Sequence, residues 1–192
     1  MALEGLFVAG SDSERGGAVI AAPHPLYGGS MESAVVTELS FACEKAGLAS
    51  LRFNWRGAGA SAGELTGDES AADEDYAAAF GQLADSVSGP LICSGYSFGA
   101  AAAVRAAACS PRIRRLLLVA PPPALLDREA LLGFAGRIFV AAGEWDEIAS
   151  PAELEPLLEP CPDARLEVIA SSDHFFMAGL ADLGRAAAAF LG

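Results

Sequence analysis

The sequence predicts an α/β fold in which a mostly parallel sheet of about six to eight strands has helices on both faces. Short apolar runs alternate with segments of helical periodicity along the 192-residue chain, as in proteins built from β-α-β units. The run at residues 116–119 is apolar at every position, which is typical of a strand buried on both faces. No repeat or linker interrupts this alternation, so we expect a single domain over residues 1–192.

The first expected elements are two strands and a helix. Residues 3–8 and 17–22 are short apolar segments, and the second stops at Pro23, which cannot donate a ladder hydrogen bond. Residues 30–46 have apolar side chains at helical spacing and stop at Gly47, a residue type common just after a helix.

The middle of the chain continues the same alternation. Residues 48–55 predict a strand, followed by a glycine-rich loop at 57–67. Residues 68–87 predict an alanine-rich helix, whose acidic start suits the positive end of a helix dipole. A strand at 90–95 and a helix at 98–109 follow.

The C-terminal part completes the alternation with three strands and two helices. The strands are expected at 115–120, 137–142 and 165–169. A helix at 151–158 begins with a proline, which is favoured at the first helical position, and the last helix is expected at 177–191.

The composition argues against a nucleic-acid partner. The formal net charge is −13, from 12 basic and 25 acidic residues. Nucleic-acid binding needs a basic surface, and the one basic cluster, Arg112, Arg114 and Arg115, precedes a strand. Lys45 is the sole lysine, so a phosphate-binding loop ending in Gly-Lys-Ser/Thr is absent.

Metals, organic cofactors and membranes are not expected either. The four cysteines are widely spaced and only two histidines are present, which predicts free thiols and no zinc site. Glycines in residues 54–63 match a dinucleotide-binding fingerprint only approximately. No apolar run approaches the ~20 residues of a membrane span, and no signal peptide is evident. We therefore expect a cytoplasmic protein, of oligomeric state left open.

The segment Gly95-Tyr96-Ser97-Phe98-Gly99 carries the strongest functional signal. It is a G-x-S-x-G between an expected strand and an expected helix, the context in which a serine sits exposed on a strained turn. The glycines remove side chains that would collide there, and the helix directs its positive end at the serine. Ser97 is therefore the candidate nucleophile, although an ordinary strand-to-helix turn would give the same pattern.

An acid and a histidine follow Ser97 in the order this chemistry requires. Asp146 lies in a loop after an expected strand, and His174 lies in the loop after the last one. His174 would take the proton from Ser97, and a carboxylate would orient its ring. Asp146 is our choice for that carboxylate. The rivals are Glu144, Glu147 and Asp173.

The loop after residues 17–22 is the expected second half of an oxyanion hole. One backbone N–H should come from Phe98, the residue after the serine, and the other from this loop. Pro25 has no N–H, so Leu26 or Tyr27 is expected to donate. For His24 we expect a structural role, bonded to the loop backbone.

The substrate pocket should be open and lined by aromatic side chains. Only residues 121–136 separate two strands where a helical cap could be inserted, so no large cap domain is expected. For Arg56 we expect a partner among loop carbonyls or acids such as Asp68, with an anionic substrate group as the alternative. The aromatic residues in the loops at the presumed carboxyl edge are Tyr27, Trp55, Tyr96, Trp145, Phe175 and Phe176.

These segments resemble the α/β-hydrolase superfamily, in particular its small cap-less bacterial branch similar to dienelactone hydrolase-like proteins. The resemblance spans nearly the whole chain and rests on residues 24–31, 51–57, 95–99 and 173–176. It implies the same three catalytic residues. Dienelactone hydrolases use a cysteine nucleophile where this chain has Ser97, so their substrate is not implied. The short N-terminus also implies that one edge strand is missing.

The resulting hypothesis is a serine hydrolase that cleaves a carboxylic ester or thioester of a small acyl substrate through an acyl-enzyme. Two alternatives stay open. One is a binding or regulatory protein that keeps the fold without useful hydrolysis. The other is an acyltransferase that uses the same three residues with an acceptor other than water.

Overall fold

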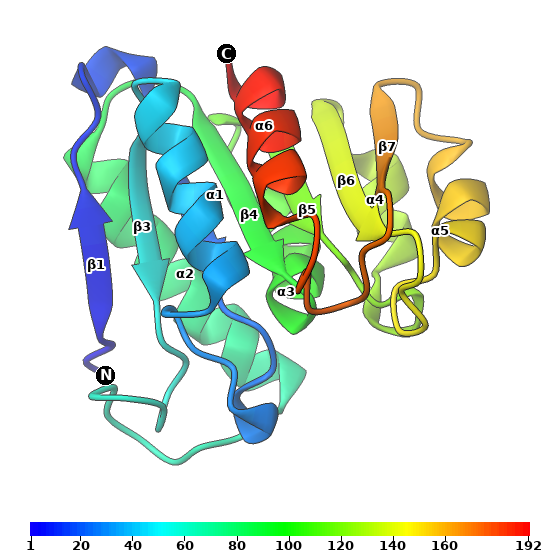
Figure 1. The fold of residues 1–192 in the computed structure, drawn as a ribbon. Helices are drawn as coiled ribbons and strands as arrows, with labels where there is room; N and C mark the ends of the chain where they lie inside the picture. Colours follow the sequence, from blue (N-terminus) through cyan, green and yellow to red (C-terminus); the bar gives the residue numbers. More distant parts are fainter.

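A computed structural model describes all residues, 1–192, and contains one seven-stranded sheet in the order β1-β3-β2-β4-β5-β6-β7. Six strands run parallel, and β1 runs antiparallel to β3 at one edge, as the opposed arrow in Figure 1 shows. The strands are β1 (Gly5–Val8), β2 (Gly17–Ala21), β3 (Ala49–Phe53), β4 (Leu91–Tyr96), β5 (Ile113–Val119), β6 (Arg137–Gly143) and β7 (Ala164–Ile169).

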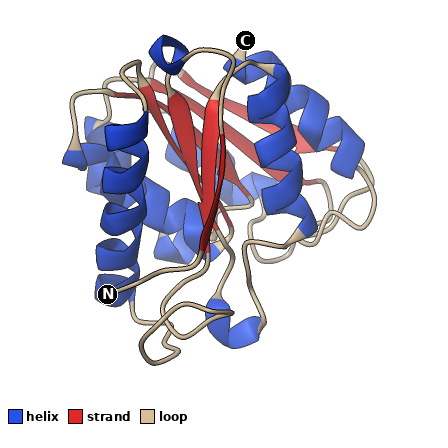
Figure 2. Ribbon diagram, turned by 90° about the vertical axis from the view of Figure 1, so that its left-hand side faces the viewer, coloured by secondary structure: helices blue, strands red, loops and turns tan.

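Helices cover both faces of this sheet. Figure 1 shows α1 and α6 in front of it and α2, α3 and α4 behind it, and Figure 2 shows the strands between the two layers. The helix α5 packs against β7 at the other edge of the sheet. The helices are α1 (Ala34–Lys45), α2 (Glu69–Ser86), α3 (Phe98–Ala106), α4 (Arg128–Gly133), α5 (Pro151–Leu158) and α6 (Leu180–Leu191).

The core lies along the central strands. Every residue of β2 and β4 is buried, and so are residues 116–119 of β5. Such strands gain stability from both faces, because helices exclude water on each side. The predicted fold class is confirmed: the sheet is mostly parallel and has helices on both faces.

Element ends differ from the expectations by a few residues. Helix α1 starts at Ala34 rather than at residue 30, because residues 30–33 form a turn in which Ser33 N–H bonds to Ser30 O. Helix α6 starts at Leu180 rather than at residue 177, after Gly179 adopts a left-handed conformation. Terminal residues of helices depend on local capping, which apolar periodicity does not encode.

The segment expected to be too short for a cap forms a 3₁₀ turn, Pro123–Leu125, and the six-residue α4. Asp127 caps α4 by accepting a hydrogen bond from the Ala130 N–H. No cap domain therefore covers the carboxyl ends of the strands, as expected.

The N-terminal edge of the sheet is formed by β1, within the strand expected at residues 3–8, and β1 is the one strand that precedes β2. Residues 5–8 of β1 pair with residues 50–53 of β3 in antiparallel register. A four-residue strand can occupy this edge because the antiparallel direction needs no crossover helix.

None of the helices combines the length and apolar composition needed to cross a lipid bilayer.

Candidate active site

Ser97 sits on a strained turn between β4 and α3. Its backbone has φ 55° and ψ −120°, a conformation that L side chains rarely adopt. A Cβ added at Gly95 would lie 2.3 Å from Gly99 C, and one added at Gly99 would lie 2.5 Å from Ala21 O. The glycines are therefore required by close backbone approach, which lets the turn pack against the end of β2.

Three side chains form a hydrogen-bonded series above this turn. The Nε2 atom of His174 lies 3.0 Å from Ser97 Oγ, and its Nδ1 atom lies 2.8 Å from Asp146 Oδ2. All three residues are buried, and the most exposed of them, Ser97, is 9% exposed. A carboxylate only accepts hydrogen bonds, so Nδ1 carries the proton and Nε2 accepts one from the Ser97 hydroxyl. This tautomer leaves Nε2 able to act as a base.

The carboxylate of Asp146 is held in its ionised form. Burial would raise the pKa of this carboxyl, but hydrogen bonds from His174 and from the Ala149 and Ile148 N–H groups lower it below its ordinary value. The ionised carboxylate can therefore orient the His174 ring and stabilise a positive charge on it.

The rival acids lie elsewhere. Glu144 accepts a hydrogen bond from the Ser171 N–H, and Asp173 accepts one from the Phe175 N–H. Glu147 is exposed on the surface. Of the four acids after Ser97 that the sequence offered, the structure brings Asp146 to the histidine.

Two loops are joined so that the acid and the histidine meet. The Trp145 N–H donates to Ser172 O, and a Cβ on Gly143 would lie 2.4 Å from the same carbonyl. The Tyr96 hydroxyl donates a 2.8 Å hydrogen bond to the His174 carbonyl. Burial, followed by the charges of Asp146 and Asp173, raises the pKa of this hydroxyl, so it stays protonated as a donor.

The two N–H groups expected as oxyanion donors from the loop after β2 make hydrogen bonds within that loop. The Leu26 N–H donates to His24 Nδ1 at 3.3 Å, and the Tyr27 N–H donates to His24 O at 3.1 Å. Both N–H groups are used inside the 3₁₀ turn Pro25–Tyr27, because the two ends of such a turn satisfy one another.

Two other N–H groups are free of protein acceptors. They belong to Phe98, the first residue of α3, and to His24. Both residues line the cavity beside Ser97, and their rings lie 4.7 Å apart. The sequence held a signal for His24: proline on both sides makes it the sole N–H donor between Ala22 and Leu26.

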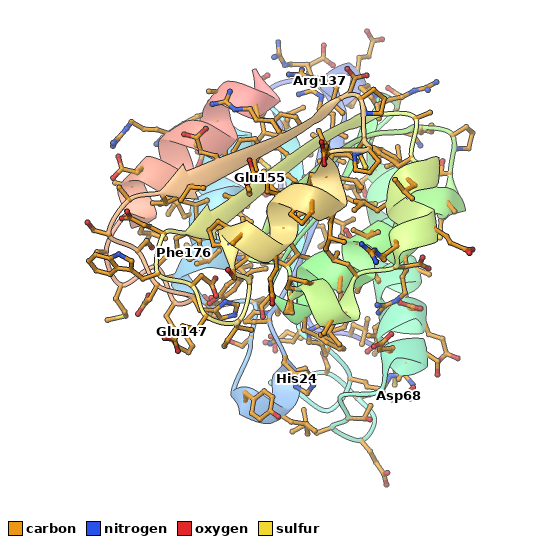
Figure 3. All side chains as sticks on the ribbon, turned by 90° about the vertical axis from the view of Figure 1, so that its right-hand side faces the viewer. His24, Asp68, Arg137, Glu147, Glu155 and Phe176 are labelled. Carbon is orange, nitrogen blue, oxygen red and sulfur yellow. The ribbon has the colours of Figure 1, made fainter.

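The side chain of His24 has the structural role that we expected. Its Nδ1 accepts the Leu26 N–H, and desolvation lowers the pKa of the ring, which keeps it neutral and able to accept. A Cβ at Gly67 would lie 2.5 Å from its Nε2 atom, so the ring also contacts the end of the glycine-rich loop. Figure 3 shows His24 on the loop at one end of the molecule.

A cavity of about 710 Å³ opens over Ser97 and His174. This volume falls in the range of small-molecule sites. Three of the six expected aromatic residues line it, Tyr27, Tyr96 and Phe175.

The other three aromatic residues are placed differently from the expectation. Trp55 is 1% exposed and Phe176 is 2% exposed, and both belong to the hydrophobic core. Trp145 is on the surface, outside the cavity lining. Position in a loop at the right edge does not fix side-chain direction, and large rings gain most free energy by burial.

Trp55 contacts the loop that borders the site. Its indole Nε1–H lies within hydrogen-bond distance of Ala22 O, at 3.0 Å, and Pro23 O, at 3.2 Å. Its ring also makes an edge contact with the Phe98 ring. Trp55 therefore fixes the loop that carries the His24 N–H.

Arg56 is not among the residues that line the cavity. Its guanidinium and its backbone N–H bond to Asp75, which is 2% exposed, and the guanidinium also bonds to Glu74. These hydrogen bonds raise its pKa. Its main acidic partner is Asp75 on α2 rather than the Asp68 that we expected. The pair anchors the start of the glycine-rich loop.

No three His, Cys, Asp or Glu side chains come close enough together to hold a metal ion. The four cysteines are unpaired, and three of them are buried.

Comparisons with known proteins agree with this architecture. A model of the "Alpha/beta hydrolase family" matches residues 17–191. The uncharacterised protein RP471 of Rickettsia prowazekii is 27% identical over 184 residues, covering 91% of this chain and 77% of that protein.

Two solved structures share the fold over nearly the whole chain. An alpha-beta serine hydrolase homologue from Coxiella burnetii is 26% identical with a TM-score of 0.88, covering 99% of this chain and 92% of that one. XC6422 from Xanthomonas campestris, an a/b serine hydrolase without lid, is 28% identical with a TM-score of 0.74, covering 96% and 86%. These matches support a hydrolase-type function.

Proposed function

Because the chain belongs to the alpha/beta hydrolase family, we propose that it is a serine hydrolase acting on a small-molecule carboxylic ester or thioester. The observation that carries this proposal is the hydrogen-bonded series Ser97–His174–Asp146 at the floor of an open cavity. The nucleophile, the base and the orienting acid have the geometry that acyl transfer requires.

Acylation begins with attack of Ser97 Oγ on the substrate carbonyl carbon. The hydroxyl proton passes to His174 Nε2, 3.0 Å away, and the carbonyl π electrons move to the oxygen. The tetrahedral intermediate collapses when His174 returns the proton to the leaving alcohol or thiol. Between these two steps Asp146 stabilises the positively charged His174 ring, and its own carboxylate stays ionised.

Deacylation repeats these steps with water. His174 takes a proton from water, the hydroxide attacks the acyl-enzyme, and the carboxylic acid leaves as Ser97 Oγ regains the proton. Every atom of the substrate and of one water molecule appears in the two products.

The free N–H groups of Phe98 and His24 are the donors that we assign to the oxyanion. Both belong to residues that line the cavity beside Ser97, and neither has a protein acceptor. Preorganised donors of this kind stabilise the tetrahedral oxygen without reorganisation cost during the reaction.

The test is hydrolysis of p-nitrophenyl esters of increasing acyl length, with wild type beside Ser97→Ala. We expect turnover by wild type and loss of it in the variant. A fluorophosphonate should label wild type and not Ser97→Ala. Equal ester hydrolysis by both proteins would overturn the assignment of Ser97. A wild type that is neither labelled nor active would favour a binding protein.

A further inference from the structure

Basic residues lie near the starts of three strands. They are Arg115 in β5, Arg137 in β6 and Arg165 in β7. Figure 3 shows Arg137 at the end of the molecule opposite Glu147 and His24. The end that holds the candidate active site is thus remote from these arginines.

Four loops border the cavity, at residues 22–33, 120–127, 144–150 and 170–179. They contain no lysine or arginine. Their carboxylates are Glu32, Asp127, Glu144, Asp146, Glu147 and Asp173. Of these, Glu32 lines the cavity itself, and its side chain is 63% exposed.

Two arginines at or just after the end of β3, Arg52 and Arg56, are engaged with protein partners. Arg52, whose side chain is 11% exposed, donates to Thr37 Oγ1 and forms a 3.6 Å ion pair with Glu32. Arg56 is bound to Asp75 and Glu74. Neither arginine is among the residues that line the cavity. The residues that line the cavity thus include one carboxylate, Glu32, and no lysine or arginine.

From this arrangement we propose that the site selects uncharged or cationic esters and discriminates against acyl groups and leaving groups that carry carboxylate or phosphate. This inference rests on the hydrolase function proposed above. It places thioesters of phosphate-bearing carriers among the poor substrates. The apolar walls, such as Leu125 and Ile148, fit an uncharged acyl chain.

The physical basis is the field of like charges around a low-dielectric cleft. Such a cleft lowers the local concentration of ligands of the same sign and slows their association. The effect on exposed charges is screened by salt, with a Debye length of about 10 Å at 0.1 M. Discrimination should therefore weaken as ionic strength rises.

The experiment compares three p-nitrophenyl esters of matched acyl length. One has a neutral pentanoyl group, one a terminal carboxylate and one a terminal trimethylammonium. At low salt we expect kcat/KM for the carboxylate ester to be about tenfold below the neutral ester, with a smaller gap in 0.5 M salt.

Equal kcat/KM for the neutral and carboxylate esters would overturn the substrate class and leave the hydrolase function standing. Turnover of none of the three esters would overturn the hydrolase function, and the substrate class with it. Faster turnover of the carboxylate ester would show an unrecognised cationic subsite and would also overturn the proposal.

Two variants separate local charge from net charge. Glu32→Gln removes the cavity carboxylate and should raise the carboxylate-to-neutral ratio of kcat/KM about threefold. Asp163→Asn makes the same charge change before β7, at the far end of the sheet, and should leave the ratio unaltered. Equal ratios in both variants and wild type would show that Glu32 does not affect the selection, and would overturn the proposal that charge at the cavity causes it.

Discussion

The Tyr96 hydroxyl donates a 2.8 Å hydrogen bond to the carbonyl of His174, 78 positions later in the chain. Tyr96 immediately precedes Ser97, so the strand that presents the nucleophile also holds the loop that presents the base. This buried contact therefore contributes to the distance between the nucleophile and the base.

Removing that contact should lower turnover more than stability. We expect Tyr96→Phe to reduce kcat about tenfold, because small misplacement of a base is costly. Loss of one buried hydrogen bond should cost about 1 kcal/mol in the free energy of unfolding. Steady-state kinetics and urea unfolding measure the two effects. An unchanged kcat together with lower stability would mean that the contact serves the fold alone.

The His24 N–H can be removed by a proline, since His24 has φ −60°, which proline adopts without strain. We expect His24→Pro to lower kcat by about 10²–10³, the usual cost of losing one oxyanion donor. His24→Ala is the matched control, because it removes the imidazole and keeps the N–H. Equal kcat values in the two variants would assign the second donor to another group.

Asp146 should make stability depend on acid pH. Its pKa in the folded protein is lowered, so the unfolded chain binds the proton more readily, and the stabilisation is present above about pH 4. It is lost as pH falls through the lowered folded value. Unfolding free energies of wild type and Asp146→Asn should therefore converge between pH 5 and strongly acid pH.

Urea titrations at several pH values test this convergence, and a constant difference would contradict the lowered pKa. Asp146→Asn should also lower kcat by about 10⁴ at neutral pH, because the amide favours the wrong histidine tautomer.

Arg56 should matter for stability rather than for substrate. Arg56→Ala leaves the buried Asp75 carboxylate without its guanidinium, which we expect to cost about 2 kcal/mol. Arg185→Ala removes an exposed pair with Asp182 and should change stability by less than about 0.5 kcal/mol. Equal losses in the two variants would contradict a role for the buried pair.

The sequence alone determined the fold class and the candidate nucleophile. The periodicity of apolar residues, which is a local property of the sequence, predicts the alternation of buried strands and helices. The need for glycine on both sides of Ser97 is also a local property, because it arises from the close packing of one turn. Chain order then reduced the choice of base to His174 and the choice of acid to a few residues.

Only the tertiary structure decided how those loops meet. Leu26 and Tyr27 use their N–H groups inside a turn, while His24 keeps its own free. Trp55 turns into the core, and Arg56 finds Asp75 on α2. Each of these outcomes depends on a partner far away in the chain or on competition for hydrogen bonds. A pattern of residue types cannot encode that competition, because it is settled by distances that exist only after the sheet has formed.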